Sequence, residues 1–586
     1  MKFLLVGINA SYMHTCLAVR SLSCYCDIPF VEFTINQSVF DILRGIEKQK
    51  ADVVLFSTYI WNAQMVCSVI CELKKIMPNV KIGAGGPEFG YAVKKYFSLL
   101  DDLDFIMSGE GEEVLLNLVQ KNQNEKTLCL EKIKGIWQKE QNNKEKLIFA
   151  GEQPLICDLS KLKFAYPCLV NADCQKDKEL SHKIYYYESS RGCPYKCSYC
   201  LSSLDTKVRF MPLERVFSDL QIFLDAKVPL VKFVDRTYNI NPERYIAIWK
   251  YIVEHHNKIT MFHFEIEAEY LSESALEFLQ TVPKNVMQFE IGVQSSNKKT
   301  LRQINRSDNI EKLSQNIKRL PPTIHKHLDL IAGLPYEDLE SFGRSFDFVL
   351  SLKPDALQLG FLKILSGTKM QEFAQQNGYK WLENPAYEVL STPSLSYKEL
   401  LFLKDLETLL DAYYNSHKFE NTMAYIQRKC SMWHFFYELT KLAQQNGVFD
   451  ASRRETFWFE FLANNWGVAG LDFEKECPAR EGGEQRSVRQ GETSPSKSVF
   501  YELLRYDFVL RGKQGGWPAW YSHVYDKERH RKLLEENGGV KNARLDFAYS
   551  EYEVFCYDVS EREPEKHFGH YEKLIFYKRQ ERLLTQ

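Results

Sequence analysis

Three cysteines stand within eight residues of the chain, in the stretch Cys193-Pro-Tyr-Lys-Cys197-Ser-Tyr-Cys200. Most of the other cysteines, from a total of 15, stand singly in apolar contexts, where a buried reduced thiol is the ordinary state. Gly192 and Pro194 favour an irregular loop around the three thiols over a helix that merely aligns them on one face. The residue types and their spacing therefore predict a metal centre held by this loop.

Two kinds of metal centre suit three neighbouring thiolates. A structural zinc site needs a fourth cysteine or histidine, commonly from a second C-x-x-C pair. Here the spacing is C-x3-C-x2-C, no second pair follows, and the candidate fourth ligands Cys168, Cys174 and His182 lie on the far side of a predicted strand. A cubane iron–sulfur cluster on three thiolates leaves one iron for a ligand from outside the protein. The sequence favours the cubane, with zinc as the alternative.

The cysteine run follows a predicted strand and carries an aromatic residue before its third cysteine, so it resembles the signature of radical S-adenosylmethionine (SAM) enzymes. The resemblance implies that Cys193, Cys197 and Cys200 bind a [4Fe-4S] cluster whose open iron chelates SAM. It also implies reductive cleavage of SAM to a 5′-deoxyadenosyl radical in an enclosed barrel, where the cofactor supplies the difficult chemistry. No catalytic side chain is assigned. The positions that match SAM-contacting parts of the family's barrel are Tyr199, Asp235, Arg236, Glu267, Glu290, Gln294 and Gly333.

The match around the SAM-contacting strands has one departure. The family's usual Gly-Gly-Glu motif is absent where Asp235 and Arg236 stand. Carboxylates on the next strands, such as Glu265 and Glu290, also fit the ordinary alternation of polar and apolar residues along a strand. A SAM contact and a plain polar strand face therefore both stay open for these carboxylates.

The cysteine loop must be positioned by the residues around it, and residues 183–394 read as a run of βα units. Short apolar runs such as 230–235 and 286–294 alternate with helical patterns, which is typical of a parallel sheet covered by helices. Six strands over roughly 190 residues predict a partial (β/α)6 barrel and not a closed barrel of eight units. We expect this domain to carry the radical SAM chemistry.

The first 125 residues predict an α/β domain with a doubly wound, flavodoxin-like sheet. Ligands of such a sheet bind beyond the carboxyl ends of its strands. In front of a radical SAM barrel, the stretches GAGGPE and DFIMSGEGEE resemble the B12-binding domains of the cobalamin-dependent radical SAM class. The resemblance implies cobalamin contacts from the residues that collect at the strand ends, namely Asn9, Ser57, Gly85, Gly86, Gly109 and Glu110.

The lower axial ligand of the cobalt is a separate question. The D-x-H-x-x-G motif, which supplies an axial histidine in many B12 proteins, is absent, and the corresponding loop reads GINASYMHTCLAV. His14 is the only imidazole in that loop. We therefore expect either that His14 is the axial ligand or that it hydrogen-bonds locally and leaves the cobalt without a protein imidazole.

The rest of the chain connects or follows these domains. Residues 126–182 predict a connecting hairpin and linker, and residues 395–586 predict a mainly helical C-terminal domain with an aromatic core. Residues 474–498 are polar and almost free of apolar side chains, which predicts disorder. The complete layout resembles a family that joins a B12-binding domain, a radical SAM domain and a C-terminal domain of unknown function of the DUF4080 type.

Composition limits the partners of this protein. The formal net charge of −2 offers no support for general nucleic-acid binding. No apolar run approaches the roughly 20 residues of a membrane helix, so we expect a cytoplasmic protein without a membrane partner. The radical SAM resemblance implies an electron donor such as a flavodoxin or a ferredoxin. The substrate is unknown.

The combined expectation is a cobalamin-dependent radical SAM enzyme, foremost a methyltransferase that acts on an unactivated carbon. A first alternative within the class uses cobalamin for a rearrangement or cyclisation without methyl transfer. Alternatives from other classes are a non-catalytic iron–sulfur redox or sensor protein and a zinc-stabilised binding module. S-adenosylhomocysteine as a product separates methyl transfer from rearrangement, and iron and corrinoid absorption separates these enzymes from the zinc module.

Overall fold

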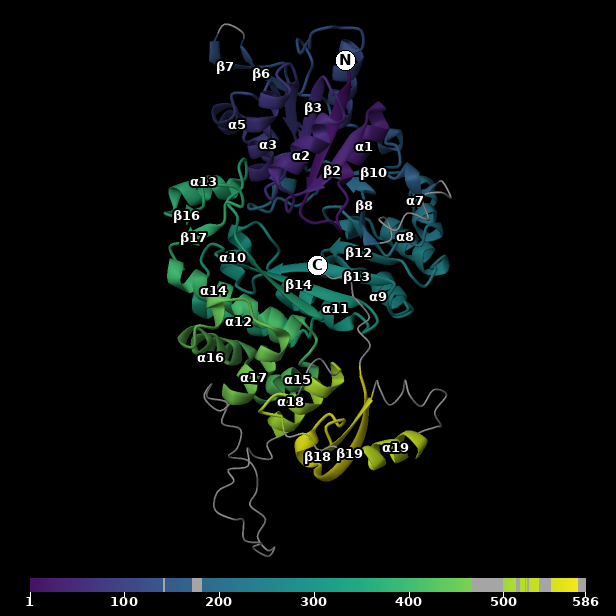
Figure 1. Cartoon of the computed structure of the whole chain (residues 1–586), viewed down its shortest axis with the longest axis vertical. Helices are drawn as coiled ribbons and strands as arrows, with labels where there is room; N and C mark the ends of the chain where they lie inside the picture. The colour runs from purple at the N-terminus through teal and green to yellow at the C-terminus, as the bar shows by residue number, and fades with distance from the viewer. Residues whose placement is uncertain are drawn as a thin grey trace, which may run out of the picture. The chain divides into compact units, whose positions relative to one another are not determined.

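The protein divides into two compact units in the computed structural model (Figure 1). The first unit comprises Met1–Phe342 and Gln358–Tyr397, and the second comprises Gly343–Leu357 and Lys398–Gln586. The predicted disordered segment 474–498 lies outside the described residues. The structure describes residues 1–140, 143–170, 182–465, 499–512, 517–521, 523, 526–536 and 550–577.

The first sheet has the predicted doubly wound order, with strands arranged β2-β1-β3-β4-β5-β6-β7. Its first five strands are parallel. They are β1 (Phe3–Asn9), β2 (Phe30–Thr34), β3 (Val53–Ser57), β4 (Lys81–Gly85) and β5 (Phe105–Met107). Successive residues of β1 enter opposite apolar clusters, because side chains alternate along a strand. The sheet is therefore buried on both faces.

Helices cover each face of this sheet (Figure 1). Side chains of α2 (Val39–Glu47), α3 (Ala63–Ile76), α4 (Pro87–Tyr91) and α5 (Val93–Leu99) join the apolar cluster on one face. Side chains of α1 (Leu17–Cys26) and α6 (Gly111–Asn122) join the cluster on the other face.

The hairpin predicted in the connecting region extends this first sheet. Its strands β6 (Ile136–Glu140) and β7 (Asn143–Phe149) are antiparallel, and β6 pairs with β5. The pairing gives β5 a hydrogen-bonded neighbour on a side that would otherwise be an open edge. Trp137 of β6 packs against the apolar cluster of the sheet.

The second sheet has six strands in the order β15-β14-β13-β12-β11-β8, which confirms the predicted partial (β/α)6 barrel. The strands from β8 to β14 are all parallel. One face is aromatic, and Phe233, Phe262 and Phe289 on it are fully buried. The strands are β8 (Ile184–Tyr187), β11 (Leu230–Phe233), β12 (Met261–Ile266), β13 (Met287–Gln294), β14 (His325–Ala332) and β15 (Ala356–Phe361).

The helices of this barrel follow its strands in the chain. They are α7 (Leu213–Asp225), α8 (Pro242–Glu254), α9 (Glu273–Leu279), α10 (Lys298–Gln303), α11 (Ile310–Arg319) and α12 (Leu339–Ser351). A two-stranded ribbon of β9 (Ser190–Arg191) and β10 (Arg209–Phe210) encloses the three cysteines between its strands in sequence. Helix α13 (Lys369–Gln376) and a short pair of strands, β16 (Lys380–Trp381) and β17 (Val389–Ser391), follow β15.

The second unit is mainly helical, as predicted, and its core is aromatic. Tyr413, Phe435, Phe436 and Phe459 are fully buried. The unit also contains an antiparallel pair, β18 (Ser550–Tyr557) and β19 (Phe568–Phe576), which was not among the predicted elements. Its helices include α14 (Tyr397–Leu410), α15 (Glu420–Lys429), α16 (Met432–Gln445), α17 (Glu455–Asn465), α18 (Val499–Leu510) and α19 (Lys527–Glu536).

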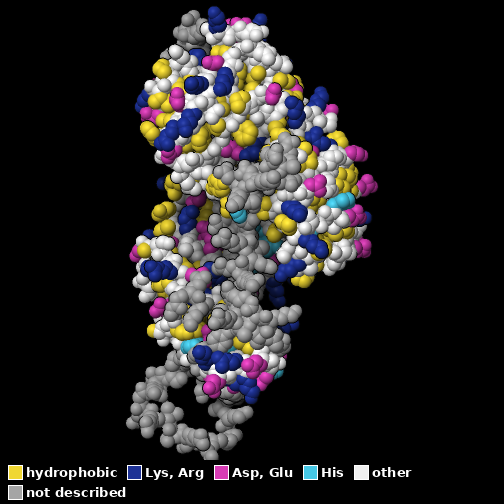
Figure 2. Space-filling model, turned by 45° about the vertical axis from the view of Figure 1, so that its right-hand side comes forward, with side chains coloured by type: hydrophobic (Ala, Val, Ile, Leu, Met, Phe, Trp, Pro, Cys, Tyr) yellow, Lys and Arg dark blue, Asp and Glu magenta, His cyan; other side chains and the backbone are white. Residues whose placement is uncertain are grey.

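The described surface shows no concentration of one charge on the face in view. Lysine and arginine side chains are interspersed with aspartate and glutamate over the face drawn in Figure 2. Among the described residues, no helix combines the length and the apolar character that crossing a membrane requires.

Candidate cofactor site

A cavity of about 1130 Å³ is lined by residues of both sheets of the first unit. It is larger than the roughly 300–1,000 Å³ of a pocket for a drug-sized ligand. Its walls include the strand ends of the first sheet and the loop that carries the third cysteine. The predicted cofactor residues on its walls are Asn9, His14, Ser57, Gly85, Gly86, Gly109, Glu110, Tyr199, Cys200, Arg236 and Gln294.

The first domain contributes a closely packed turn to this cavity. Gly86 has a φ of +105°, and a Cβ at this position would lie 2.5 Å from the Thr58 carbonyl oxygen. The Thr58 hydroxyl donates to the Gly85 carbonyl at 2.8 Å. Only glycine fits this backbone position, so the cavity wall here is bare main chain at the end of β4.

The cysteine loop is anchored at several points of the barrel. Gly192 has a φ of +88°, and a Cβ would lie 2.4 Å from the Lys207 carbonyl oxygen. The next residue, Cys193, donates its amide to the Asp205 carbonyl at 2.9 Å, and its Sγ lies 3.5 Å from Thr237 Oγ1. Glycine is required where the ribbon turns into the loop, because both the φ and the close approach exclude a side chain.

The far end of the loop is held by main-chain hydrogen bonds. The Ser198 amide donates to the Ile304 carbonyl at 3.0 Å, and its carbonyl accepts from the Met370 amide at 2.8 Å. Within the described part of the chain, no three histidine, cysteine or acidic side chains converge closely enough to hold a single metal ion, as a closed zinc site would require. Of the three thiols, Cys200 reaches the large cavity, and Cys197 lines a neighbouring hollow of about 40 Å³.

Arg306 lies beside Cys197 and was not predicted. Its Nη2 donates to both carboxylate oxygens of Glu267 at 2.7 Å and to the Gly292 carbonyl at 2.7 Å, and its Nη1 is 4.0 Å from Cys197 Sγ. Burial raises the pKa of Cys197, and the Arg306 charge opposes that shift. Glu267, a predicted SAM contact, therefore pairs with an arginine that also faces a cluster thiol.

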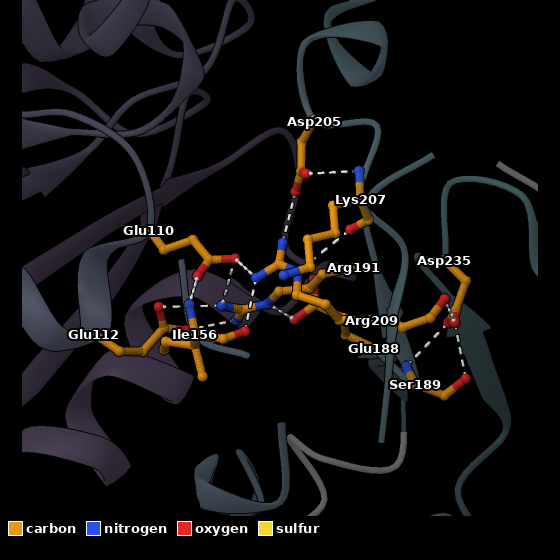
Figure 3. A network of polar contacts seen from close by, with 11 residues as sticks. Glu110, Glu112, Ile156, Glu188, Ser189, Arg191, Asp205, Lys207, Arg209 and Asp235 are labelled. Atoms are coloured by element: carbon orange, nitrogen blue, oxygen red, sulfur yellow. Dashed lines mark hydrogen bonds and ion pairs between the residues drawn. The ribbon is translucent and has the colours of Figure 1, made fainter. Parts of the chain in front are cut away.

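The other predicted SAM residues occupy different environments. Asp235 is 1% exposed and accepts from the Ser189 amide at 3.0 Å, from the Ser189 hydroxyl at 2.8 Å and from the Ser190 hydroxyl (Figure 3). Its neighbour Arg236 lines the large cavity. Asp235 thus holds the turn that leads into the cysteine loop, and its carboxylate is not on the cavity wall.

Glu290 and Gly333 also lie outside the cavity lining. Glu290 accepts from His263 Nε2 at 3.0 Å and from Lys232 Nζ at 3.2 Å. Burial raises the pKa of Glu290, but the His263 hydrogen bond and the Lys232 charge outweigh burial, so the pKa is lowered. Gly333 follows β14 with a φ of +90°, and a Cβ there would lie 2.7 Å from Val389 Cγ1.

Gln294 carries an unsatisfied polar atom on the cavity wall. The residue is 9% exposed, and within the described residues its buried Oε1 has no hydrogen-bond partner. It also has a φ of +68°, which is rare for a residue with a side chain. A buried acceptor without a partner costs stability, so this atom is suited to a ligand that donates a hydrogen bond.

An ion network joins the first domain to the cysteine ribbon (Figure 3). Glu112 at the start of α6 contacts Arg191 of β9 at 2.6 Å, and Glu110 contacts Arg209 of β10 at 2.7 Å and Arg191 at 3.4 Å. The four side chains are between 3% and 15% exposed. The Glu110 carboxylate, predicted as a cobalamin contact, is therefore engaged by arginines next to the cluster loop.

His14 has a local hydrogen-bond partner. Its Nδ1 lies 2.6 Å from the Tyr186 hydroxyl, and its ring stacks on the Tyr186 ring with the centroids 6.1 Å apart. Burial, followed by the nearby Lys232 and Lys183 charges, lowers the pKa of His14. The imidazole is therefore favoured in its neutral form on the cavity wall.

Three family models match successive parts of the chain. The B12 binding domain matches residues 6–119, the radical SAM superfamily matches residues 187–349, and DUF4080, a protein family of unknown function, matches residues 375–577. These matches show a radical SAM enzyme. More specifically, the chain is a radical SAM protein with an N-terminal B12-binding domain and a C-terminal DUF4080 domain.

Individual relatives agree with this assignment. The chain is 23% identical over 359 residues to "Uncharacterized methyltransferase PH0819" of Pyrococcus horikoshii, which covers 60% of this chain and 75% of that protein. It is 24% identical over 310 residues to "Cobalamin-dependent radical SAM methyltransferase TokK" of Streptomyces tokunonensis. That match covers 50% of this chain but only 44% of TokK.

A solved structure has a similar fold. The cobalamin-dependent S-adenosylmethionine radical enzyme OxsB, solved with aqua-cobalamin and S-adenosylmethionine bound, matches with a TM-score of 0.58 and 13% identity. The match covers 86% of this chain and 78% of the OxsB chain.

The cofactors of the matched domains are a [4Fe-4S] cluster, SAM and cobalamin, as predicted. The residues present fit them. The loop offers three thiols, Gly86 leaves bare main chain on the cavity wall, and Gln294 Oε1 has no hydrogen-bond partner among the described residues. Sequence reasoning missed four residues near the cysteine loop, namely Arg191, Arg209, Glu112 and Arg306. The only signal for any of them was that Arg191 directly precedes Gly192.

Proposed function

We propose that this protein is a cobalamin-dependent radical SAM methyltransferase that acts on an unactivated carbon of its substrate. One observation carries the proposal: a single cavity is lined both by the strand ends of the B12-binding domain and by the cysteine loop of the barrel. Methyl transfer to a carbon radical requires the methyl donor and the radical site to come near contact distance, and a shared cavity meets that requirement. When bound, the cluster with SAM would supply the radical and cobalamin would carry the methyl group.

The proposal gives the chain's residues distinct roles. Cys193, Cys197 and Cys200 hold the cluster, and the bound SAM occupies the part of the cavity next to Cys200. Tyr199, Arg236 and Gln294 line that part and contact SAM. Asn9, Ser57, Gly85, Gly86 and Gly109 face the corrinoid from the strand ends of the first sheet.

Other predicted residues act by positioning. Asp235 secures the start of the cysteine loop through Ser189 and Ser190. Glu267 orients Arg306 beside Cys197, which places a positive charge next to a cluster ligand. Glu110 aligns the two domains by its contact with Arg209. Together these carboxylates would hold the cysteine loop in place beside the first domain.

The chemical test is an anaerobic assay with SAM, cobalamin and a reductant such as reduced flavodoxin, ferredoxin or titanium citrate. Wild-type protein should be brown, carry iron and corrinoid, and form both 5′-deoxyadenosine and S-adenosylhomocysteine. The triple Cys193/Cys197/Cys200→Ala variant should lose iron and SAM cleavage. A triple variant of cysteines outside the loop, Cys67/Cys71/Cys129→Ala, is the matched control and should keep both.

Each alternative outcome identifies a different protein. Formation of 5′-deoxyadenosine without S-adenosylhomocysteine would replace methyl transfer by rearrangement or cyclisation. Iron without any SAM cleavage would indicate a redox or sensor protein. SAM cleavage that survives in the cluster variant would refute the assignment of the three thiols.

A further inference from the structure

The second sheet carries a polar face opposite its aromatic face. Parallel pairing places Glu265 of β12 directly beside Glu290 of β13, and Glu290 beside His327 of β14. Two residues further along the same two strands, Gly292 stands beside Asp329. Because every second residue of a strand points to the same side, these side chains share the barrel's interior face. Asp329 also lines the large cavity.

The cations on this face neutralise only one of its three carboxylates. Glu290 accepts from Lys232 and from His263. His263 Nδ1 lies 2.6 Å from the Gln288 amide nitrogen, which is a donor, so the ring proton lies on Nε2 and His263 is neutral. Burial lowers the pKa of His263 to about 4, which agrees with the neutral ring. Lys232 is thus the charged partner of Glu290.

Glu265 and Asp329 are left without comparable partners. Within the described residues no hydrogen bond is made to the Glu265 carboxylate, and Asp329 Oδ1 is buried without a hydrogen-bond partner. The nearest cationic atom of an ion pair to Asp329 is His327 Nε2, at 3.8 Å, beyond hydrogen-bonding distance. Burial and the neighbouring carboxylates raise the pKa of Asp329 well above its ordinary value. A cation bound here would remove that penalty.

A second, independent feature marks the same wall as a ligand site. Gln294, at the end of β13, is 9% exposed and presents an unpaired acceptor, Oε1, whose two lone pairs can accept from SAM and from a second ligand beside it. Together Gln294 and Asp329 offer the cavity two acceptors on adjacent strands. Arg236 lies near Glu265 and Arg306 lies near Asp329, and Arg306 is already engaged by Glu267.

We propose that Asp329 binds a cationic group of the substrate, an ammonium or a guanidinium, on the interior face of the barrel, and that the charge of Glu265 adds to the attraction. This inference rests on the proposed function, because it assigns a substrate class to the same cavity. A neutral donor would satisfy the free oxygen of Asp329 but would not offset the charge of its carboxylate in the ionised form. A cation does both, since charge-assisted hydrogen bonds are the stronger kind.

The binding test uses simple probes and needs no knowledge of the substrate. Wild-type protein is titrated with n-butylammonium, n-butylguanidinium, n-butanol and butyrate at constant ionic strength, and binding is followed by saturation-transfer NMR. We expect the cations to bind at least about tenfold more tightly than butanol. Equal binding of ammonium and butanol, or preferred binding of butyrate, would overturn the inference without any variant.

Variants locate the binding. Asp329→Asn and Glu265→Gln keep side-chain size; Asp329→Asn should reduce the cation preference by about tenfold or more, and Glu265→Gln should reduce it less. Glu273→Gln is the matched control, because Glu273 is a 74% exposed carboxylate that pairs with Arg319 at 2.7 Å on the surface of the same unit. The assignment is refuted if Asp329→Asn loses no more of the cation preference than Glu273→Gln does.

A last measurement separates substrate binding from SAM binding. Asp329→Asn should retain its iron and its slow SAM cleavage in the absence of substrate. If the variant loses SAM binding while its iron stays, Asp329 serves SAM and the inference fails. If wild-type protein shows the cation preference but cleaves no SAM, the cation site stands and the proposed function fails, so the two failures are distinguishable.

Discussion

Replacing Arg191 with methionine should open the cysteine ribbon while the rest of the protein stays folded. Arg191 is 13% exposed and contacts Glu112 at 2.6 Å and Glu188 at 2.8 Å. Methionine keeps the length of the side chain but leaves these carboxylates, and Glu110, without this cation. Removing one partner of a buried ion pair costs about 3–5 kcal/mol. This cost corresponds to an increase of about 160- to 5,000-fold in a local opening equilibrium.

The expected effect is local because β9 and β10 are each two residues long, so the ribbon has few ladder hydrogen bonds of its own. The Cys193 amide, which bonds the Asp205 carbonyl at 2.9 Å, reports the opening through its hydrogen exchange. Its protection should fall by the same factor of about 160 to 5,000, and the iron content per chain should fall with it.

The matched control is Arg319→Met, which breaks the pair with Glu273. That pair is 45% and 74% exposed, so its loss should cost under about 1 kcal/mol and leave the cluster in place. The reasoning is wrong if the Cys193 amide is as well protected from hydrogen exchange in Arg191→Met as in the control and the iron content is unchanged. In that case the ion network does not hold the ribbon.

Three further changes test other parts of the structure. Gly192→Ala places a Cβ 2.4 Å from a carbonyl oxygen at a φ of +88°, so it should cost at least about 1–3 kcal/mol of stability and most of the bound iron. Gly151→Ala, with a φ of +92° and open space around the Cβ, is the control and should keep the iron. Equal iron contents in the two variants would contradict this reasoning. Asp507 accepts hydrogen bonds from the Thr422 amide and hydroxyl, at 2.8 and 2.7 Å, and Asp507→Asn weakens both. The free energy of unfolding of the second unit, measured in urea, should fall by about 1.5–3 kcal/mol. An unchanged urea midpoint would show that Asp507 does not stabilise this unit. Burial and then Glu290 raise the pKa of Glu265 from 4.5 to about 7, so its contribution to stability is full below pH 4.5 and lost as the pH rises through 7. Glu265→Gln should therefore gain up to about 3 kcal/mol over wild type at pH 8 and nothing at pH 4, and unfolding curves with a pH-independent difference would exclude the shift.

Local chemistry explains what was predictable in this protein. The three cluster cysteines lie within one loop, so their spacing and the flanking Gly192 and Pro194 carry the prediction without any tertiary contact. Apolar runs that alternate with helical patterns likewise predicted both parallel sheets, because a buried strand and its covering helix each show their pattern over a few residues. The strand-end residues of the first domain followed from the sheet type, since parallel strands end on one edge.

Pairings between distant residues decided the rest. Glu112 meets Arg191 across 79 residues, and Arg306 meets Cys197 across 109, and neither arginine belongs to a local pattern. The antiparallel pairing of β18 with β19 was also not predicted. By itself, the sequence determined which cofactors this chain is suited to and the order of its domains. The tertiary structure alone decided which carboxylates secure the cysteine loop and which remain to meet a ligand, because the partner of a buried charge is chosen by the fold and not by its neighbours along the chain.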